Sequence, residues 1–179
     1  SNSSNVVGPR TATEDELLSF HTQKYIECVR RVNSKCGPLG NYGFGLGSND
    51  NPVFEGIYDA AILSTGASMT GVDLLISGNS NKVFSIAGGL HHAMPNNASG
   101  FCIFNDPVLA INKLLDAGMK VAYVDIDCHH GDGVQYAFYH SDKVLTISIH
   151  ESGEYLFPGT GFLDEIGSGK GRGYSVNLP

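Results

Sequence analysis

The chain has 179 residues, 41% of them hydrophobic, which is enough for one compact domain with a sizeable core. Its net charge of −7 argues against direct binding to nucleic acids, which needs a basic face. No apolar run approaches the ~20 residues of a membrane span, and the first residues do not resemble a signal peptide. We therefore expect a cytoplasmic protein (nuclear if its source is eukaryotic) that does not bind a membrane and whose four cysteines are reduced.

The first half of the chain predicts helices and one long loop. We expect residues 1–12 to be a disordered or tag-like leader. Residues 13–16 resemble a capping box, so a helix should begin after Thr13, and Thr22 is suited to cap a second helix. Residues 37–51 are rich in glycine and asparagine and predict a loop. Pro52 suits the first turn of a longer helix over about residues 53–76, ending at Gly78.

The second half alternates between short apolar segments and helical segments. We predict strands over residues 83–87, 121–127, 144–149 and 174–179. Asp106 followed by Pro107 predicts a helix N-cap and first turn, and this helix should run to about Ala117. A short helix is expected around residues 133–140. The alternation predicts an α/β fold with a parallel sheet and right-handed crossovers.

Histidines and carboxylates follow three of the predicted strands. His91 and His92 come after the first strand, residues 125–132 carry the polar groups of the second, and His150 ends the third. In an open parallel sheet, ligands bind beyond the carboxyl ends of the strands. The sequence therefore predicts a functional site at this edge of the sheet.

Residues 125–129 predict a metal site at that edge. Because side chains alternate along a strand, Asp125, Asp127 and His129 should share one face, while Ile126 and Cys128 should point into packing. Two neighbouring carboxylates repel each other unless a cation lies between them. Aspartate and histidine are ordinary zinc ligands and also suit iron(II). A lone Asp-x-Asp or His-His pair is more often structural, so the prediction depends on their combination.

Four sequence blocks agree, in order, with one known family. They are residues 88–93 (GGLHHA), 99–102 (SGFC), 125–133 (DIDCHHGDG) and 157–161 (FPGTG). Together they resemble the histone deacetylase superfamily, and residues 150–157 are most similar to its bacterial acetoin-utilization branch. The resemblance implies an arginase/deacetylase-like fold with three αβα layers and a mainly parallel sheet. Residues 13–179 would be a partial, incomplete domain of this kind, truncated at its C-terminus.

The resemblance also implies a function and assigns roles to matched residues. The enzyme would be a zinc-dependent (or Fe²⁺-dependent) hydrolase that removes the acetyl group from an acetylated protein or a small acetylated amine. The metal ligands would be Asp127 and His129. The catalytic residues would be His91, His92, Asp125 and Asp132. Asp125 would hydrogen-bond His91, and Asp132 would hydrogen-bond His92, because a carboxylate fixes a histidine tautomer and raises its basicity.

Further matched positions concern the substrate and monovalent ions. Phe101 and Phe157 would line a narrow tunnel for an acyl-lysine stem, with Gly100 lining it through its backbone. Asp50 would hold substrate amides at the rim. Without the resemblance, the two phenylalanines would be interpreted as core residues and Asp50 as a turn residue. A structural potassium ion would be bound by Asp125, Asp127, His129, Ser148 and Ile149, and a second monovalent ion would lie near Phe138, Ser141 and Val144.

The sequence departs from the family in two respects. A third metal ligand, an aspartate, and an oxyanion-binding tyrosine should follow in later segments, and neither segment occurs before Pro179. Because loss of an oxyanion donor alone costs ~100- to 1000-fold in rate, we expect this chain by itself to be inactive or nearly so. The alternatives are a non-catalytic module that binds acyl-lysine or a partner protein, and another metal hydrolase on the same scaffold, such as a ureohydrolase. The sequence leaves the substrate and the oligomeric state open.

Overall fold

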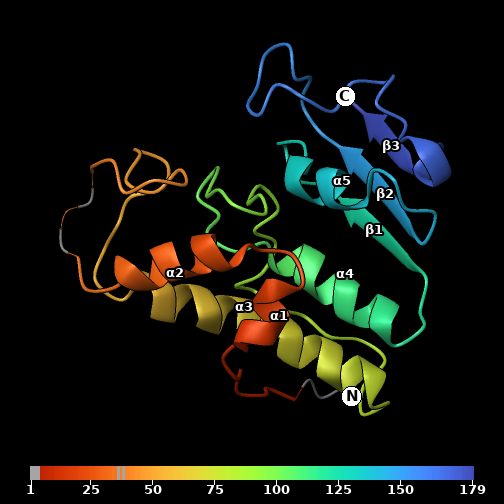
Figure 1. The fold of residues 1–179 in the computed structure, drawn as a ribbon. Coiled ribbons are helices and arrows are strands. Elements are labelled where there is room, and N and C mark those ends of the chain that lie inside the picture. The colour runs from red at the N-terminus through yellow and green to blue at the C-terminus, as the bar shows by residue number, and fades with distance from the viewer. Residues whose placement is uncertain (1–4, 36, 38) are drawn as a thin grey trace.

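The computed structural model describes residues 5–35, 37 and 39–179 (Figure 1). Residues 1–4 of the expected leader, and the cysteine at position 36, lie outside the described residues. The elements in chain order are α1 (Glu14–Leu18), α2 (Gln23–Arg31), α3 (Ile57–Ile76), α4 (Asp106–Asp116), β1 (Val121–Asp125), α5 (Asp132–Phe138), β2 (Val144–Ile149), the short 3-10 helix η1 (Gly169–Gly171) and β3 (Ser175–Leu178). Among the described helices, none is both long and apolar enough to cross a membrane.

The first two helices begin where their capping residues predict. The Thr13 side chain accepts a hydrogen bond from the Glu16 N–H, and the Glu16 carboxylate accepts one from the Thr13 N–H, which completes the capping box. Thr22 caps α2 through the Tyr25 N–H. The predicted break between two short helices is therefore confirmed.

The starts of α3 and α4 differ from the prediction. Helix α3 begins at Ile57 rather than near residue 53, because Gly56 precedes it with a left-handed φ of 86°. The side chain of Asn33, from the end of α2, caps it by accepting the Tyr58 N–H at 2.8 Å. Helix α4 is capped by Asn105, not Asp106, which becomes its first residue and is freed for another contact described below.

Two apolar clusters meet at α4. The first packs helices α1 to α4 together and includes Leu17, Tyr25, Ile26, Met69, Phe104 and Leu109. The second packs α4 and α5 against the sheet and consists of Val108, Ile111, Val134, Phe138 and Val144. Figure 1 shows α4 between helices α1 to α3 and the sheet, with α5 beside the strands. Helix α4 therefore ties the helical layer to the strands that carry the polar residues.

The described sheet has three parallel strands in the order β1-β2-β3. Val121 pairs with Val144, and Thr146 pairs with Ser175. Strand β2 has the predicted bounds, and β3 confirms the predicted C-terminal strand. The α/β class with an incomplete parallel sheet is therefore confirmed.

Two strand predictions were wrong. Residues 83–87 form no strand, and Phe84 and Ile86 are 89% and 90% exposed. A strand needs a hydrogen-bonded neighbour, and none of the described strands pairs with this segment. Strand β1 ends at Asp125 instead of residue 127 and is buried on only one face, so Val124 and Ile126 are exposed rather than packed. In the described part of the chain, helices therefore pack against only one of the two faces of the sheet.

Candidate active site

The loop that carries the tandem histidines is fixed by the start of α4. The Asp106 carboxylate accepts hydrogen bonds from the N–H groups of Gly89 (3.1 Å) and Leu90 (2.9 Å), and from the Ser68 hydroxyl (2.5 Å). The Asn105 side-chain amide donates to the His91 carbonyl at 3.1 Å. The N-terminal end of α4 thus holds the backbone on which the histidines are mounted.

His91 and His92 are both buried, and each binds a carboxylate through Nδ1. His91 Nδ1 lies 2.6 Å from Asp125 Oδ2, and His92 Nδ1 lies 2.7 Å from Asp132 Oδ1. The two ring centroids are 4.1 Å apart. These are the pairings that the resemblance implies. With Nδ1–H donated to a carboxylate, Nε2 of each neutral ring is the atom left to accept a proton.

The surroundings of Asp125 favour a charged pair. Burial lowers the pKa of His91, but the hydrogen bond and charge of Asp125, together with the charges of Asp127 and Asp132, raise it above its ordinary value. Burial likewise opposes ionisation of Asp125, but hydrogen bonds from His91 and Tyr123 lower the pKa of this carboxyl. The Tyr123 hydroxyl donates to Asp125 Oδ2 at 2.6 Å. Sequence analysis missed Tyr123, although strand alternation places it on the face of Asp125.

Asp127 and His129 lie beside this pair in a bend after β1. Asp127 Oδ1 accepts the backbone N–H of His129 at 2.7 Å and lies 3.0 Å from His129 Nδ1. Burial opposes ionisation of Asp127, but these contacts with His129 lower its pKa. The His129 and His92 rings meet edge to face, with centroids 5.9 Å apart. The expected metal ligands and the catalytic pair therefore adjoin each other.

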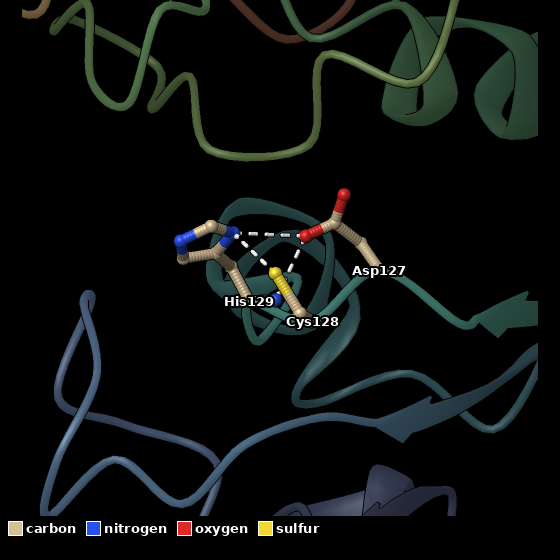
Figure 2. A group of neighbouring side chains, drawn as sticks. All are labelled: Asp127, Cys128 and His129. Atoms are coloured by element: carbon tan, nitrogen blue, oxygen red, sulfur yellow. Dashed lines mark hydrogen bonds and ion pairs between the residues drawn. The ribbon is translucent and has the colours of Figure 1, made fainter.

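Cys128 does not point away from these residues, contrary to the prediction. Its side chain is exposed, and its Sγ lies 3.3 Å from His129 Nδ1 (Figure 2). The strand ends at Asp125, so the alternation of side chains no longer holds three residues later. Among the described residues, Asp127, Cys128 and His129 are the one group of three possible metal ligands, with ligand atoms all within 4.8 Å of one another. An O, S, N donor set of this kind fits zinc.

Phe157 and Gly100 border His92. The ring centroids of Phe157 and His92 are 4.9 Å apart. Gly100 has a φ of 51°, and a Cβ at this position would lie 2.5 Å from His92 Cδ2 and 3.0 Å from Phe157 Cε1. Phe101 and Phe157 are 74% and 45% exposed, so the alternative that they are plain core residues is wrong.

The remaining expected site residues are Asp50 and those expected to bind monovalent ions. Asp50 is exposed in its loop, and no described contact joins it to the histidines. Asp125 and Ser148 are register partners at the ends of β1 and β2, with Ile149 next to Ser148. Ser141 donates its N–H to the Phe138 carbonyl in the turn before Val144. Both potassium sites stay predictions.

A second histidine pair lies in the loops beyond the sheet edge. The rings of His130 and His150 are buried, with centroids 4.7 Å apart. His150 binds Ser148 Oγ (2.7 Å) and the Gly161 carbonyl (2.9 Å). His130 binds Thr160 Oγ1 at 2.8 Å. This pair therefore anchors the loop that carries Phe157.

Sequence analysis missed two further residues beside this histidine pair, Gln135 and Glu165. Gln135 Oε1, from α5, accepts from His130 Nε2 at 3.2 Å, and the Gln135 side-chain NH2 donates to Glu165 Oε2 at 2.6 Å. Glu165 Oε1 accepts the N–H groups of Gly161 (3.0 Å) and Phe162 (3.2 Å). No local pattern joins residues 30 positions apart, so nothing in the sequence pointed to this contact.

Comparison with known proteins identifies the family of the chain. The family model of the histone deacetylase domain matches residues 1–179. The acetoin utilization protein AcuC of Bacillus subtilis is 47% identical over 176 residues, covering 97% of this chain and 46% of that protein. Histone deacetylase RPD3 of Saccharomyces cerevisiae is 46% identical over 173 residues, covering 95% of this chain and 40% of RPD3.

A solved structure agrees as well. The crystal structure of an HDAC homologue from Aquifex aeolicus superposes with a TM-score of 0.87 at 42% identity, covering 96% of this chain and 46% of that one. The chain spans less than half the length of each of these relatives. The family model, the relatives and the fold agree, and the chain belongs to the histone deacetylase family.

Proposed function

We propose that the chain is the histidine-bearing and metal-binding part of a zinc-dependent deacetylase. The substrate would be an acetyl-lysine side chain or a small acetylated amine. The observation that carries this proposal is the pair of buried histidines, each bound to its own carboxylate, beside Asp127 and His129. A relative named for acetoin utilization and one named as a histone deacetylase are almost equally similar, so both substrate classes stay within the proposal.

Asp127 and His129 would hold the zinc ion. When bound, zinc supplies a Lewis acid that polarises the amide carbonyl and acidifies the attacking water. Asp125 and Asp132 keep the Nδ1–H of the two histidines engaged, which leaves Nε2 of each ring as a proton acceptor. One ring takes the proton from water, and an imidazolium returns a proton to the leaving amine.

The wall beside His92 suits an apolar acyl-lysine stem. The Phe157 ring stands edge to face with His92, and Gly100 leaves no side chain between them. An apolar surface here would exclude water from the reacting carbonyl and strengthen the electrostatic contacts around it. Phe101 is exposed at the same loop and would cover the stem from outside.

We further propose that this chain alone turns over slowly. The family's third metal ligand and its oxyanion tyrosine have no counterpart among the matched residues of this chain. A missing oxyanion donor costs ~100- to 1000-fold in rate. The complete gene product would then be the enzyme.

The test is acetate release from an acetyl-lysine peptide with added zinc, measured for this chain and for the complete gene product. We expect release by the complete gene product, and a fall of at least ~100-fold in its His92→Ala and Asp127→Ala variants. His140→Ala is the matched control, because His140 is an exposed histidine bound to Ser168. Full activity in Asp127→Ala would contradict the proposal. A gene product that binds the peptide without releasing acetate would support the binding-module alternative instead.

A further inference from the structure

We propose that a cavity beside α5 binds a small organic ammonium ion. The cavity has a volume of about 610 Å³, and ligand sites in proteins typically measure about 300–1,000 Å³. Its wall is formed by residues of α5 and the two residues that follow it, by the turn between α1 and α2, by Met94, and by Thr160 and Glu165. His92 and Phe157 do not line it, so this cavity is separate from the expected acyl-lysine tunnel. The inference therefore goes beyond the proposed function.

The charges of the wall favour a cation. Asp132 and Glu165 supply two carboxylates, and among the described residues no lysine or arginine lines the cavity. The two histidines of the wall, His130 and His140, are hydrogen-bonded to uncharged partners. An anion would be repelled by both carboxylates, whereas an ammonium ion is attracted by them.

Asp132 has an oxygen atom available for such a ligand. Its Oδ1 lies 2.7 Å from His92 Nδ1 and accepts the Gly133 N–H at 2.9 Å. Its Oδ2 has no hydrogen-bond partner in the part of the chain that the structure describes, although the side chain is only 13% exposed. An ammonium group that donates to Oδ2 would form a charge-assisted hydrogen bond, which is stronger than a bond between neutral groups. The ligand would then share this carboxylate with His92.

Aromatic side chains line the rest of the cavity. Phe20, Tyr136 and Tyr139 contribute their rings, and Met94 adds an apolar side chain. The face of an aromatic ring attracts an ammonium ion, and its apolar surface also suits the hydrocarbon part of an amine. A bare metal ion would instead need several oxygen ligands around it. The combination of rings and carboxylates therefore favours an organic cation over a metal ion.

An NMR titration of this chain with benzylammonium tests the inference without any assay of activity. Benzyl alcohol is the uncharged counterpart of this probe, and benzoate is the anionic one. Because the alcohol cannot form the charge-assisted bond, we expect benzylammonium to bind at least ~10-fold more tightly, and benzoate not to bind. The backbone amide signals of α5 should shift as benzylammonium is added, and their dependence on its concentration gives the Kd.

Two variants test the two kinds of contact separately. Asp132→Asn removes the charge and should weaken binding of benzylammonium by at least ~10-fold, while binding of benzyl alcohol stays unchanged. Asp142→Asn is the matched control, because Asp142 is exposed and does not line the cavity. Tyr136→Ala removes a ring of the wall and should weaken binding of both compounds. Tyr136 is 60% exposed, so its loss should leave the fold intact.

The outcomes separate this inference from the proposed function. Saturable binding of benzylammonium that weakens in Asp132→Asn and Tyr136→Ala, but not in Asp142→Asn, would support it. Equal binding in all of these proteins would mean attraction to the net charge of −7, and would overturn it. Equal affinity for benzyl alcohol, or no shift of the α5 signals with any of the three compounds, would overturn it as well. None of these results depends on acetate release, so an inert complete gene product would contradict the proposed function and leave the cation site standing.

Discussion

The two histidine pairs differ in what holds them. His91 and His92 are bound by carboxylates at Nδ1, and their Nε2 atoms have no hydrogen-bond partner in the part of the chain that the structure describes. His130 and His150 use both ring nitrogens, and their partners are hydroxyl groups, an amide and a backbone carbonyl. The first pair is suited to proton transfer, whereas the second is a fixed structural support.

One histidine of each pair, His91 or His130, has a pKa that its surroundings shift. Burial opposes protonation of His91, but Asp125, with the charges of Asp127 and Asp132, raises its pKa above the ordinary value. For His130, burial and then the neighbouring His150 lower the pKa, so its neutral form is favoured. Burial lowers the pKa of both His91 and His130, but carboxylates oppose this effect at His91, whereas His150 adds to it at His130. The residue type alone therefore does not reveal the role.

The largest effect is expected where a carboxylate of the first pair loses its charge. In Asp132→Asn the side-chain oxygen still accepts from His92 Nδ1 and from the Gly133 N–H, which lie 2.7 Å and 2.9 Å away. The imidazolium of His92 loses its counter-charge, so acetate release by the complete gene product should fall by about 100-fold. Thermal unfolding of the variant should change little. Equal activity in this variant and in the parent protein would mean that Asp132 only shapes the loop.

The second pair should instead respond through stability. Gly161 has a φ of 87°, and a Cβ there would overlap the rings of His130 and His150. In Gly161→Ala we expect the free energy of unfolding to fall by about 2–4 kcal/mol, from backbone strain and overpacking. Gly159→Ala is the comparison, because Gly159 has a similar φ of 82° but a Cβ there would meet only the Gly153 carbonyl oxygen, at 3.8 Å. Chemical denaturation of this chain measures both, and an equal loss in the two variants would contradict the distinction.

Local patterns predicted the local features of this molecule. The bounds of β2 and the caps Thr13 and Thr22 followed from residues only a few positions apart. Cys128 was misplaced because strand alternation was extended beyond Asp125, where the strand ends for lack of further pairing. Residues 83–87 have the composition of a strand, but strand formation depends on a neighbour that composition does not reveal.

Contacts between distant segments could not be predicted in this way. The family resemblance placed the carboxylates on their histidines, 34 and 40 positions away in the chain. The Glu165 contact with Gln135 and the Asn33 cap of α3 belong to no motif and join segments through the fold alone. The site was therefore predictable where a motif recorded it, and its supporting contacts were not.

His21 is a third buried histidine whose hydrogen-bond partners are neutral, as are those of His130 and His150. Its Nδ1–H donates to the Met94 carbonyl, and its Nε2 accepts the Asn105 N–H at 3.0 Å. Burial lowers the pKa of His21 from 6.5 to about 4. The unfolded chain therefore binds more protons between these two values, and stability should fall as the pH drops from 6.5 to about 4.

The size of this loss follows from the shift. A change of roughly 2.5 pKa units corresponds to up to about 3 kcal/mol at the acidic end of the window. Urea unfolding of this chain at a series of pH values measures the slope, and His21→Gln should flatten it, because glutamine both donates and accepts but does not titrate. An identical slope in the variant would assign the acid sensitivity to other groups.

The smallest effect is expected at the contact between Glu165 and Gln135, which lies beside the second histidine pair. In Glu165→Gln an NH2 group replaces one of the two carboxylate oxygens. This NH2 then faces another donor, which is either the Gln135 amide or the N–H groups of Gly161 and Phe162. An unmatched buried donor costs about 1–2 kcal/mol, so the free energy of unfolding should fall by that amount. Glu154→Gln, at an exposed position, is the control and should have no effect.

The reciprocal variant decides whether the contact or the charge matters. In Glu165→Gln combined with Gln135→Glu, the carboxylate at position 135 still accepts from the Asn177 amide and now also accepts from the amide at position 165. If complementarity of donors and acceptors holds this loop, the double variant should recover most of the stability lost in Glu165→Gln, measured by urea denaturation. If the double variant is no more stable than the single one, the negative charge at position 165 itself fixes the loop. The second histidine pair would then depend on a carboxylate, as the first pair does.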